Sequence, residues 1–365
     1  ISANNLEDNQ VYEIPENDLI TTGAVVAKTN TGIPAVSPEI LEEKKLLRQD
    51  VMRASLIVVA IQLFANVFSL VCGMATGVVM GVMSQVLPFS VSQLMADYAM
   101  MITFLTGYLP IMLVELLVII LGWKMFKLPP PRMKSREGGS FWPLSAFSVV
   151  GLGVIGQLLT SLLLTFFSLL RIPIYSPDFS LDWSQPTGSI LMLLYICIIG
   201  PILEEFCFRG VILKLLQRHG TSFAVLFSAV LFALFHMNLV QFCVPVLLGI
   251  FLALLTIRSG SLLPAILAHI VNNTMAMVLD MVLPADQPIL YWTGYIIYAV
   301  IFLGVLAVFA ILHGQGMVEI LRWRSPLMKL RTQLRFAFTH WSTLVLLGVY
   351  LLFLIFTGIT ALLQG

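Results

Sequence analysis

The chain of 365 residues is 59% hydrophobic and only 11% charged, and its mean hydropathy is +0.96. Soluble globular domains have about 45–50% apolar and about 25% charged residues, so this composition excludes an ordinary soluble enzyme and predicts a polytopic membrane protein. The formal net charge of +1 gives no indication of a nucleic-acid partner. The four cysteines all lie in apolar runs without CxxC spacing, so we expect no structural disulfide.

The first 36 residues are polar and acidic and show neither a helical nor a strand period. They offer too little apolar surface to offset the entropy of ordering, so we predict a flexible tail over 1–36. No basic segment precedes an apolar run here, and we expect no signal peptide in this stretch. Ser37-Pro38-Glu39 then predicts the start of a helix that leads toward the membrane, with Ser37 as N-cap and Pro38 at the first position.

Nine apolar runs follow, most of them long enough for the roughly 20 residues that a helix needs to cross a bilayer. They lie at about 54–82, 97–123, 143–170, 188–213, 221–239, 242–258, 261–283, 291–312 and 342–363. The fifth and sixth runs are short and tightly joined, so the 236–244 connection could also be re-entrant or kinked. We predict an all-α membrane protein with about nine transmembrane helices.

The positions of the basic residues indicate the orientation. If the N-terminus is cytoplasmic, the inner segments contain all of the 20 Lys and Arg residues except Lys28, Arg171 and Arg209. Cytoplasmic loops of membrane proteins are enriched in Lys and Arg, and a shifted span count would disturb this pattern. The sequence therefore predicts an N-terminus inside and a C-terminus outside.

Two connections between the predicted spans are long. The outer one, 171–187, contains three prolines and three aromatic residues, which is typical of a belt at the membrane interface, with a lid over the fourth span as the alternative. The inner one, 314–341, interleaves five basic residues with apolar ones and is broken at Pro326. It predicts an interfacial amphipathic helix attracted to anionic lipid, with peptide docking as the alternative.

The fourth span carries three ionisable side chains, Glu204, Glu205 and Arg209, inside an otherwise apolar segment. Each costs at least about 2.5 kcal/mol near the bilayer centre, so such groups usually have a use. Glu205 and Arg209 are four residues apart with the glutamate first, which is the favourable order for an ion pair on a helix. Adjacent residues point about 100° apart, so Glu204 faces elsewhere and is left for a functional role.

Two further spans carry polar side chains at helical spacing. Phe232 and His236 share a face of the fifth span, and His269 and Asn273 share a face of the seventh. We expect Glu204 and these polar groups to meet at one interior point. A carboxylate beside a histidine can activate water, and a second histidine with an asparagine amide can stabilise an oxyanion. Such a set suits amide hydrolysis.

Three alternatives remain open from the residues alone. Glu204, His236 and His269 could in principle hold a zinc ion, although the sequence has no HExxH motif. Cys207 could act as a nucleophile, but it lies on another face of the helix and a buried cysteine in a span is usually an apolar filler. The chain could also be a non-catalytic immunity or scaffold protein that binds a peptide or a transporter.

Three motifs in order, EExxxR at 204–209, FxxxH at 232–236 and HxxxN at 269–273, resemble those of the CPBP family of intramembrane glutamate endopeptidases. This family includes CAAX prenyl proteases of the Ras-converting-enzyme type and bacteriocin-processing relatives, and the stretch 261–269 is similar to the bacterial branch. The resemblance covers roughly 188–283. It implies a peptidase of the bacterial plasma membrane that needs no metal or other cofactor and acts on a membrane-associated peptide or protein, with a transporter or peptide exporter as a further partner.

The resemblance also implies roles for the motif residues. Five are expected to be catalytic and two supporting, in that order: Glu204, Glu205, His236, His269 and Asn273, then Arg209 and Phe232. Glu204 would be the general base that activates water, with His236 as its partner. His269 and Asn273 would form the oxyanion hole. Glu205, counted among the catalytic residues, would act with Arg209 to support the site.

These observations divide the chain into four parts. They are the tail at 1–36, a juxtamembrane helix with the first three spans at 37–187, a four-helix catalytic core at 188–283, and C-terminal helices at 284–365 that include the basic segment 314–341.

Overall fold

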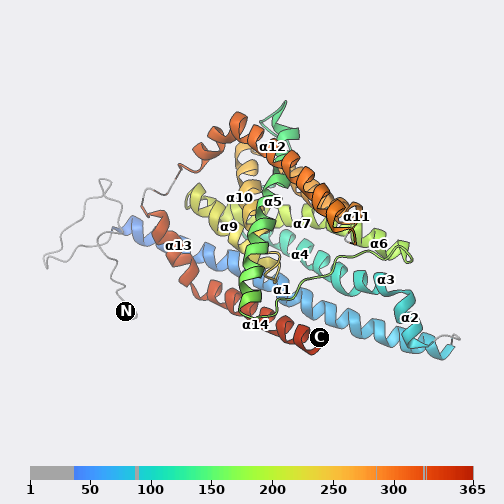
Figure 1. Ribbon diagram of the computed structural model, residues 1–365. Coiled ribbons are helices and arrows are strands. Elements are labelled where there is room, and N and C mark those ends of the chain that lie inside the picture. The colour runs from blue at the N-terminus through green and yellow to red at the C-terminus, as the bar shows by residue number, and fades with distance from the viewer. Residues whose placement is uncertain (1–36, 87–89, 285, 324, 326, 365) are drawn as a thin grey trace, which may run out of the picture.

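The computed structural model describes residues 37–364 except 87–89, 285, 324 and 326 (Figure 1). The predicted tail over 1–36 and the predicted break at Pro326 lie outside the described residues. Within the described ranges the chain forms helices and no β-strand, which confirms the all-α fold.

The first three predicted spans are helical. The helix α1 (Pro38–Val86) begins where the sequence predicts, and the Ser37 hydroxyl accepts a bond from the Ile40 amide at 3.4 Å. It continues through the first span as one helix of 49 residues. The second span comprises α3 (Ala99–Thr103), the π-helical turn η2 (Phe104–Tyr108) and α4 (Leu109–Met125), preceded by the short α2 (Val91–Asp97). The third is α5 (Phe141–Leu169).

The fourth span is a continuous helix with two π-helical turns. It consists of α6 (Pro186–Leu194), η3 (Tyr195–Ile199), α7 (Gly200–Cys207), η4 (Phe208–Ile212) and α8 (Leu213–Gln217). The chain then forms α9 (Thr221–Phe235), α10 (Cys243–Ser259), α11 (Leu263–Val282), α12 (Pro288–Ile320), α13 (Leu330–Thr339) and α14 (Trp341–Gln364).

Each of the nine predicted apolar runs is therefore helical, but they differ in length. Seven helical stretches in the described part of the chain are long and apolar enough to cross a membrane. The other two, α9 and α10, have 15 and 17 residues and fall short of the roughly 20 that a crossing needs. The chain is an integral multi-pass membrane protein, while nine crossings and their orientation stay predictions.

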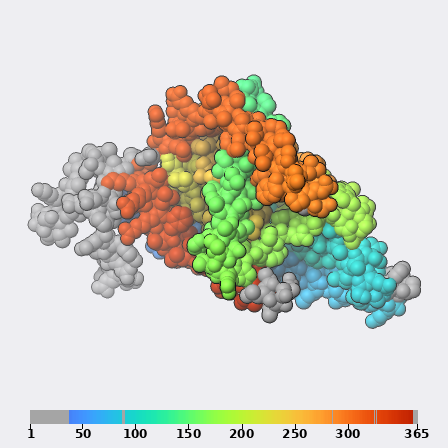
Figure 2. All heavy atoms as spheres, viewed as in Figure 1, coloured from blue at the N-terminus to red at the C-terminus, as the bar shows by residue number. Residues whose placement is uncertain are grey.

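The helices α9 and α10 form the centre of the molecule. Nearly every residue of α9 is buried. A Cβ added to Gly249 of α10 would lie 2.8 Å from Ala229 Cα of α9, so the two helices approach more closely than larger residues would permit. The helix α5 packs against α10, α11 and α12, and α1 packs against α4 and α14. Figure 1 shows α1 and α14 along one side of the molecule, and Figure 2 shows α5 and α12 side by side on one face.

The outer surface carries the large apolar side chains that a lipid-facing surface requires. Exposed Leu, Ile, Val and Phe residues are frequent in the second half of α1, in α12 and in α14. An apolar surface of this extent would be unfavourable in water, whereas a bilayer solvates it. The distribution agrees with the membrane assignment made from composition.

The predicted amphipathic segment 314–341 is divided in the structure. Residues 314–320 continue α12, and the separate helix is α13. Gln333 of α13 is buried and donates to the His219 carbonyl at 2.7 Å, and α13 packs against α9. Its buried face thus contacts protein, while Arg331 and Arg335 are exposed. Attraction of these arginines to anionic lipid stays a prediction.

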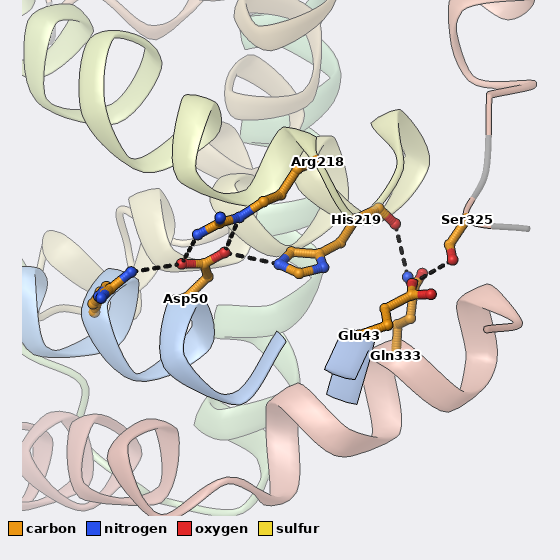
Figure 3. Close-up of polar contacts among 7 residues, drawn as sticks. Glu43, Asp50, Arg218, His219, Ser325 and Gln333 are labelled. Atoms are coloured by element: carbon orange, nitrogen blue, oxygen red, sulfur yellow. Dashed lines mark hydrogen bonds and ion pairs between the residues drawn. The ribbon is translucent and has the colours of Figure 1, made fainter. Parts of the chain in front are cut away.

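A buried aspartate links the first helix to the loop before α9 (Figure 3). Asp50 of α1 is fully buried and accepts two bonds from Arg218, both at 2.5 Å, and one contact from His219 Nε2 at 2.8 Å. Arg53 contacts the same carboxylate at 3.2 Å. Because Gln333 binds the His219 carbonyl, this single carboxylate connects α1, the α8–α9 turn and, through His219, α13.

We expect Asp50→Asn to lower the free energy of unfolding by about 2 kcal/mol, because the change leaves His219 and the two arginines without their anionic partner. Thermal unfolding in detergent, followed by circular dichroism, would measure the loss. Glu42→Gln is the matched control, since the Glu42 side chain is 61% exposed and lies 4.0 Å from its partner Lys45. Equal stability of the two variants would contradict the link.

Candidate active site

The two π-helical turns on either side of α7 set the positions of the motif residues. In η3 the Gly200 amide donates to the Tyr195 carbonyl, five residues earlier. At the same spacing of five residues, the donor to the Ile196 carbonyl would be the amide of Pro201. Proline has no N–H, so the Ile196 carbonyl is left without a helical donor. Asn273 of α11 donates its side-chain N–H to this carbonyl at 3.0 Å. The proline thus creates the acceptor that orients a predicted site residue.

Glu205, Arg209 and His269 form a buried charged cluster. Arg209 Nη1 lies 2.8 Å from Glu205 Oε1, and their side chains are 2% and 0% exposed. The ion pair predicted from the spacing is therefore present. His269 Nδ1 lies 2.9 Å from the same Glu205 oxygen. A carboxylate oxygen only accepts, so Nδ1 carries the proton of this bond and Nε2 faces the other way.

Packing fixes the Arg209 side chain from two further directions. Its guanidinium lies 4.6 Å from the centre of the Phe232 ring, within the range of a cation–π interaction. Its Nη2 donates to the Gly249 carbonyl of α10 at 3.4 Å. The Phe232 ring also meets the His236 and His269 rings edge to face, with centroids 5.1 and 5.7 Å away. The phenyl ring of the second motif therefore separates and orients the charged groups of the site.

Glu204 lies on the other side of His269. Its Oε2 is 3.7 Å from His269 Nε2, and this oxygen is buried without a hydrogen-bond partner among the described residues. The Glu204 side chain is 14% exposed, in contrast to the fully buried Glu205. Glu205 Oε2 is also buried without a partner among the described residues, so the two adjacent glutamates differ in that Glu205 is paired with an arginine and Glu204 is not.

His236 follows the last residue of α9 and caps that helix. Its Nδ1 lies 2.9 Å from the Phe232 carbonyl, which can only accept. The proton of a neutral ring is therefore on Nδ1, and the lone pair is on Nε2. The next residue, Met237, has a left-handed conformation with φ of 51°, which is uncommon for a residue with a side chain. Such geometry persists when the surroundings enforce it.

Two helices distant in sequence hold the chain around His236. Gln62 of α1 donates to the Phe235 carbonyl at 2.6 Å, and Tyr350 of α14 donates to the Asn238 carbonyl at 3.0 Å. The Asn238 side chain in turn donates to the His236 carbonyl at 2.8 Å and accepts from the Gln241 amide at 2.7 Å. The chain between α9 and α10 is thus a hydrogen-bonded turn that ends one short helix and leads to the next.

A cavity of about 700 Å³ reaches the site. His236, His269 and Asn273 line it, together with residues of α5, α11 and α12 and with residues 176–180 of the outer loop. Ser180 bonds to Asp178 in this loop and holds the pKa of that carboxyl below its usual range. Residues 176–180 of the loop therefore line the cavity, while a belt at the membrane interface and a lid over the fourth span both stay predictions. Glu204 does not line the cavity itself; the ring of His269 connects the two.

One residue of the site was missed by sequence reasoning. Glu115 of α4 is fully buried, and α4 packs against α7, the helix that carries Glu204. Neither Glu115 oxygen has a hydrogen-bond partner within the described part of the chain. The sequence contains a signal for this residue. Apart from Asp97 at its first position, the apolar run 97–123 has a single acidic residue, Glu115.

The predicted zinc alternative can be compared with this geometry. No group of three or more His, Cys, Asp or Glu side chains in the described ranges is arranged to hold a metal ion. Cys207 is fully buried, which suits the predicted role of apolar filler. The arrangement can instead abstract a proton, through Glu204, and donate hydrogen bonds, through His269 and Asn273.

Comparison with known proteins gives a family match in this region and a match to a curated bacterial relative. Residues 186–275 match the family described as Rce1-like, type II CAAX prenyl endopeptidase. "Putative membrane peptidase YdiL" of Bacillus subtilis (strain 168) is 33% identical over 92 residues, which cover 25% of this chain and 38% of that relative. The match thus spans well under half the length of the curated relative. No solved structure matches the chain.

The fold and the site define a class: a polytopic helical membrane protein with a buried cluster of two glutamates, two histidines and an arginine beside a cavity. The match of residues 186–275 and the three motifs support a member of the CPBP family.

We expect Arg209→Ala to destabilise the fold by about 3–5 kcal/mol, because it leaves the buried Glu205 carboxylate without its cation. Thermal unfolding in detergent would show the loss. Glu204→Gln is the matched variant on the same helix, and it should unfold near the wild-type temperature, since Glu204 has no arginine partner. Equal destabilisation by both substitutions would refute this division of roles.

Proposed function

We propose that the protein is an endopeptidase of the bacterial plasma membrane that hydrolyses a peptide bond of a membrane-associated peptide or protein. The family match and the name of the bacterial relative support a membrane peptidase. The observation that carries the proposal is the free, buried Glu204 oxygen 3.7 Å from His269, beside a cavity that two histidines and an asparagine line.

In this proposal Glu204 and His236 activate a water molecule. The His236 ring has its proton on Nδ1, so Nε2 can accept a hydrogen bond from water at the edge of the cavity. Glu204 takes a proton from this water as the water oxygen forms a bond to the scissile carbonyl carbon. The product of this step is a tetrahedral intermediate whose oxygen carries a negative charge.

Asn273 and His269 stabilise that oxyanion. Asn273 uses one N–H on the Ile196 carbonyl, which fixes the amide and leaves its second N–H for the cavity. His269 donates from Nδ1 to Glu205, and Nε2 is directed toward Glu204. The ring is thus placed to receive the proton that Glu204 has taken and, while doubly protonated, to donate to the oxyanion. That proton goes to the leaving amine nitrogen as the carbon–nitrogen bond breaks.

The role of Glu205 in this scheme is to orient and charge-balance His269. Arg209 compensates the Glu205 carboxylate in the ground state. The same carboxylate accepts from His269 Nδ1, which fixes the tautomer and the orientation of the ring. Glu205 therefore acts through His269, whereas Glu204 acts on water.

We expect Glu204→Gln to reduce peptide cleavage at least about 100-fold, because the amide keeps the shape of the side chain but cannot accept the proton. The full-length protein would be reconstituted in liposomes with a peptide library, and the products identified by mass spectrometry. Glu42→Gln, an exposed change far from the cavity, is the control for reconstitution. Normal cleavage by Glu204→Gln would refute the glutamate mechanism.

A chelator separates this mechanism from zinc catalysis. We expect EDTA to leave the cleavage rate of the reconstituted protein within about twofold, since Glu204 and the two histidines perform the proton transfers directly. Loss of cleavage with EDTA, followed by recovery with zinc, would favour the metal-dependent alternative. The product masses from the same assay would also show the cleavage site.

A further inference from the structure

The mechanism above leaves one buried acid without a role. Glu115 lies in the middle of α4, is 0% exposed, and has no hydrogen-bond partner for either oxygen within the described ranges. An acidic side chain in a membrane-spanning helix is costly, and it is usually paired or placed toward the interior of the bundle. Glu115 is inside the bundle, but no arginine or lysine pairs with it in the described part of the chain.

The surroundings of Glu115 point to Glu204. The helix α4 packs against α7, which carries Glu204, and also against α1, η2 and η4. The Tyr108 and Tyr195 rings lie 5.0 Å apart, and Trp123 Nε1 donates to the Gly210 carbonyl at 3.3 Å, so the second and fourth spans run side by side in the same direction. Glu115 lies between these contacts on the second span, at the level where Glu204 lies on the fourth. Glu204 lies beside His269, with its Oε2 3.7 Å from His269 Nε2. Glu115 therefore approaches the site from α4, a helix that carries neither of the two histidines.

The charges near Glu115 leave it no cation of its own. Arg209 is held 2.8 Å from Glu205 and above the Phe232 ring. His269 is bonded to Glu205 through Nδ1. Two carboxyl groups that interact in an apolar interior do not both ionise readily, and their protons belong to the pair rather than to either residue.

We propose that Glu115 and Glu204 form a buried carboxyl pair that holds a single proton, with Glu115 as the positioning residue that carries it while Glu204 works as the base. The free Glu204 oxygen and the two free Glu115 oxygens are the groups that this proton joins, directly or through one water. This inference rests on the proposed function, because it concerns the state of the Glu204 base.

The pair has a defined consequence for catalysis. A protonated Glu115 presents an O–H dipole to Glu204 and stabilises its negative charge in an apolar site. Glu204 then stays ionised, and able to accept a proton from water, at a lower pH than a lone buried glutamate would. Glu115 acts on water only through Glu204, so its removal should change the pH dependence of kcat rather than KM.

The test compares Glu115→Leu with Glu115→Gln in reconstituted protein, with kcat and KM measured across pH. In Glu115→Leu the acidic limb of the kcat profile should move to higher pH by about one unit, with KM within about twofold. In Glu115→Gln the amide N–H replaces the carboxyl O–H, so the acidic limb should return to within about 0.3 unit of wild type.

Three outcomes would overturn the pair. A Glu115→Leu profile that superimposes on that of wild type would assign Glu115 to packing. Profiles of both variants that fall by the same factor at every pH would assign it to packing as well. An acidic limb that moves to lower pH in Leu would show that Glu115 is charged in the active protein.

Infrared difference spectroscopy tests the pair without any cleavage assay. The C=O stretching band of a protonated carboxyl should be present at neutral pH in wild type, absent in Glu115→Gln, and shifted in Glu204→Gln. If Glu204→Gln still cleaved peptide, the proposed mechanism would fall, while this band would still decide whether the two carboxyls share a proton. A band that Glu115→Gln leaves unchanged would refute the pair.

Discussion

The ion pair between Glu205 and Arg209 is the interaction on which the site depends. Both side chains lie out of contact with solvent, and a buried charge is tolerated only when it is paired and hydrogen-bonded. The pair meets that condition by a 2.8 Å bond, by the Phe232 ring and by the Gly249 carbonyl. The pair also orients His269. The same Glu205 oxygen binds His269 Nδ1, so Nε2 is the ring nitrogen directed toward Glu204.

The helix that carries these residues contains π-helical turns, and these turns make backbone carbonyls available to neighbouring helices. A regular α-helix satisfies its own carbonyls and offers no backbone acceptor to a neighbour. The π-helical turn before Pro201 leaves the Ile196 carbonyl free, and Asn273 binds it. The turn η4 contains Arg209 and Gly210, and the Gly210 carbonyl accepts a bond from Trp123 of α4 at 3.3 Å. The fourth span thus binds its neighbours through its backbone as well as its side chains.

Much of this organisation could be predicted from the sequence, for identifiable reasons. Apolar runs located every long helix, because length and hydropathy are local properties. Helical spacing separated Glu205 from Glu204 and placed the histidines on common faces, since i, i+4 geometry is also local. Glu115 is different in kind: it was visible as an acid in an apolar run, but its relation to Glu204 depends on how α4 packs on α7. The bonds from Gln62 and Tyr350 to the turn around His236 likewise join residues more than 100 positions apart, which spacing cannot reveal.

Those distant bonds determine whether a fragment of the chain could retain the site. The matched segment 186–275 contains every motif residue, yet Gln62, Glu115 and Tyr350 all come from helices outside it. A four-helix fragment cut at the family boundaries would retain the motifs and lose the groups that shape the His236 turn and adjoin the Glu204 carboxyl. Grafting the motifs onto another helical bundle would meet the same difficulty. The unit that holds the site together is therefore larger than the matched segment, because it includes the outer helices α1, α4 and α14.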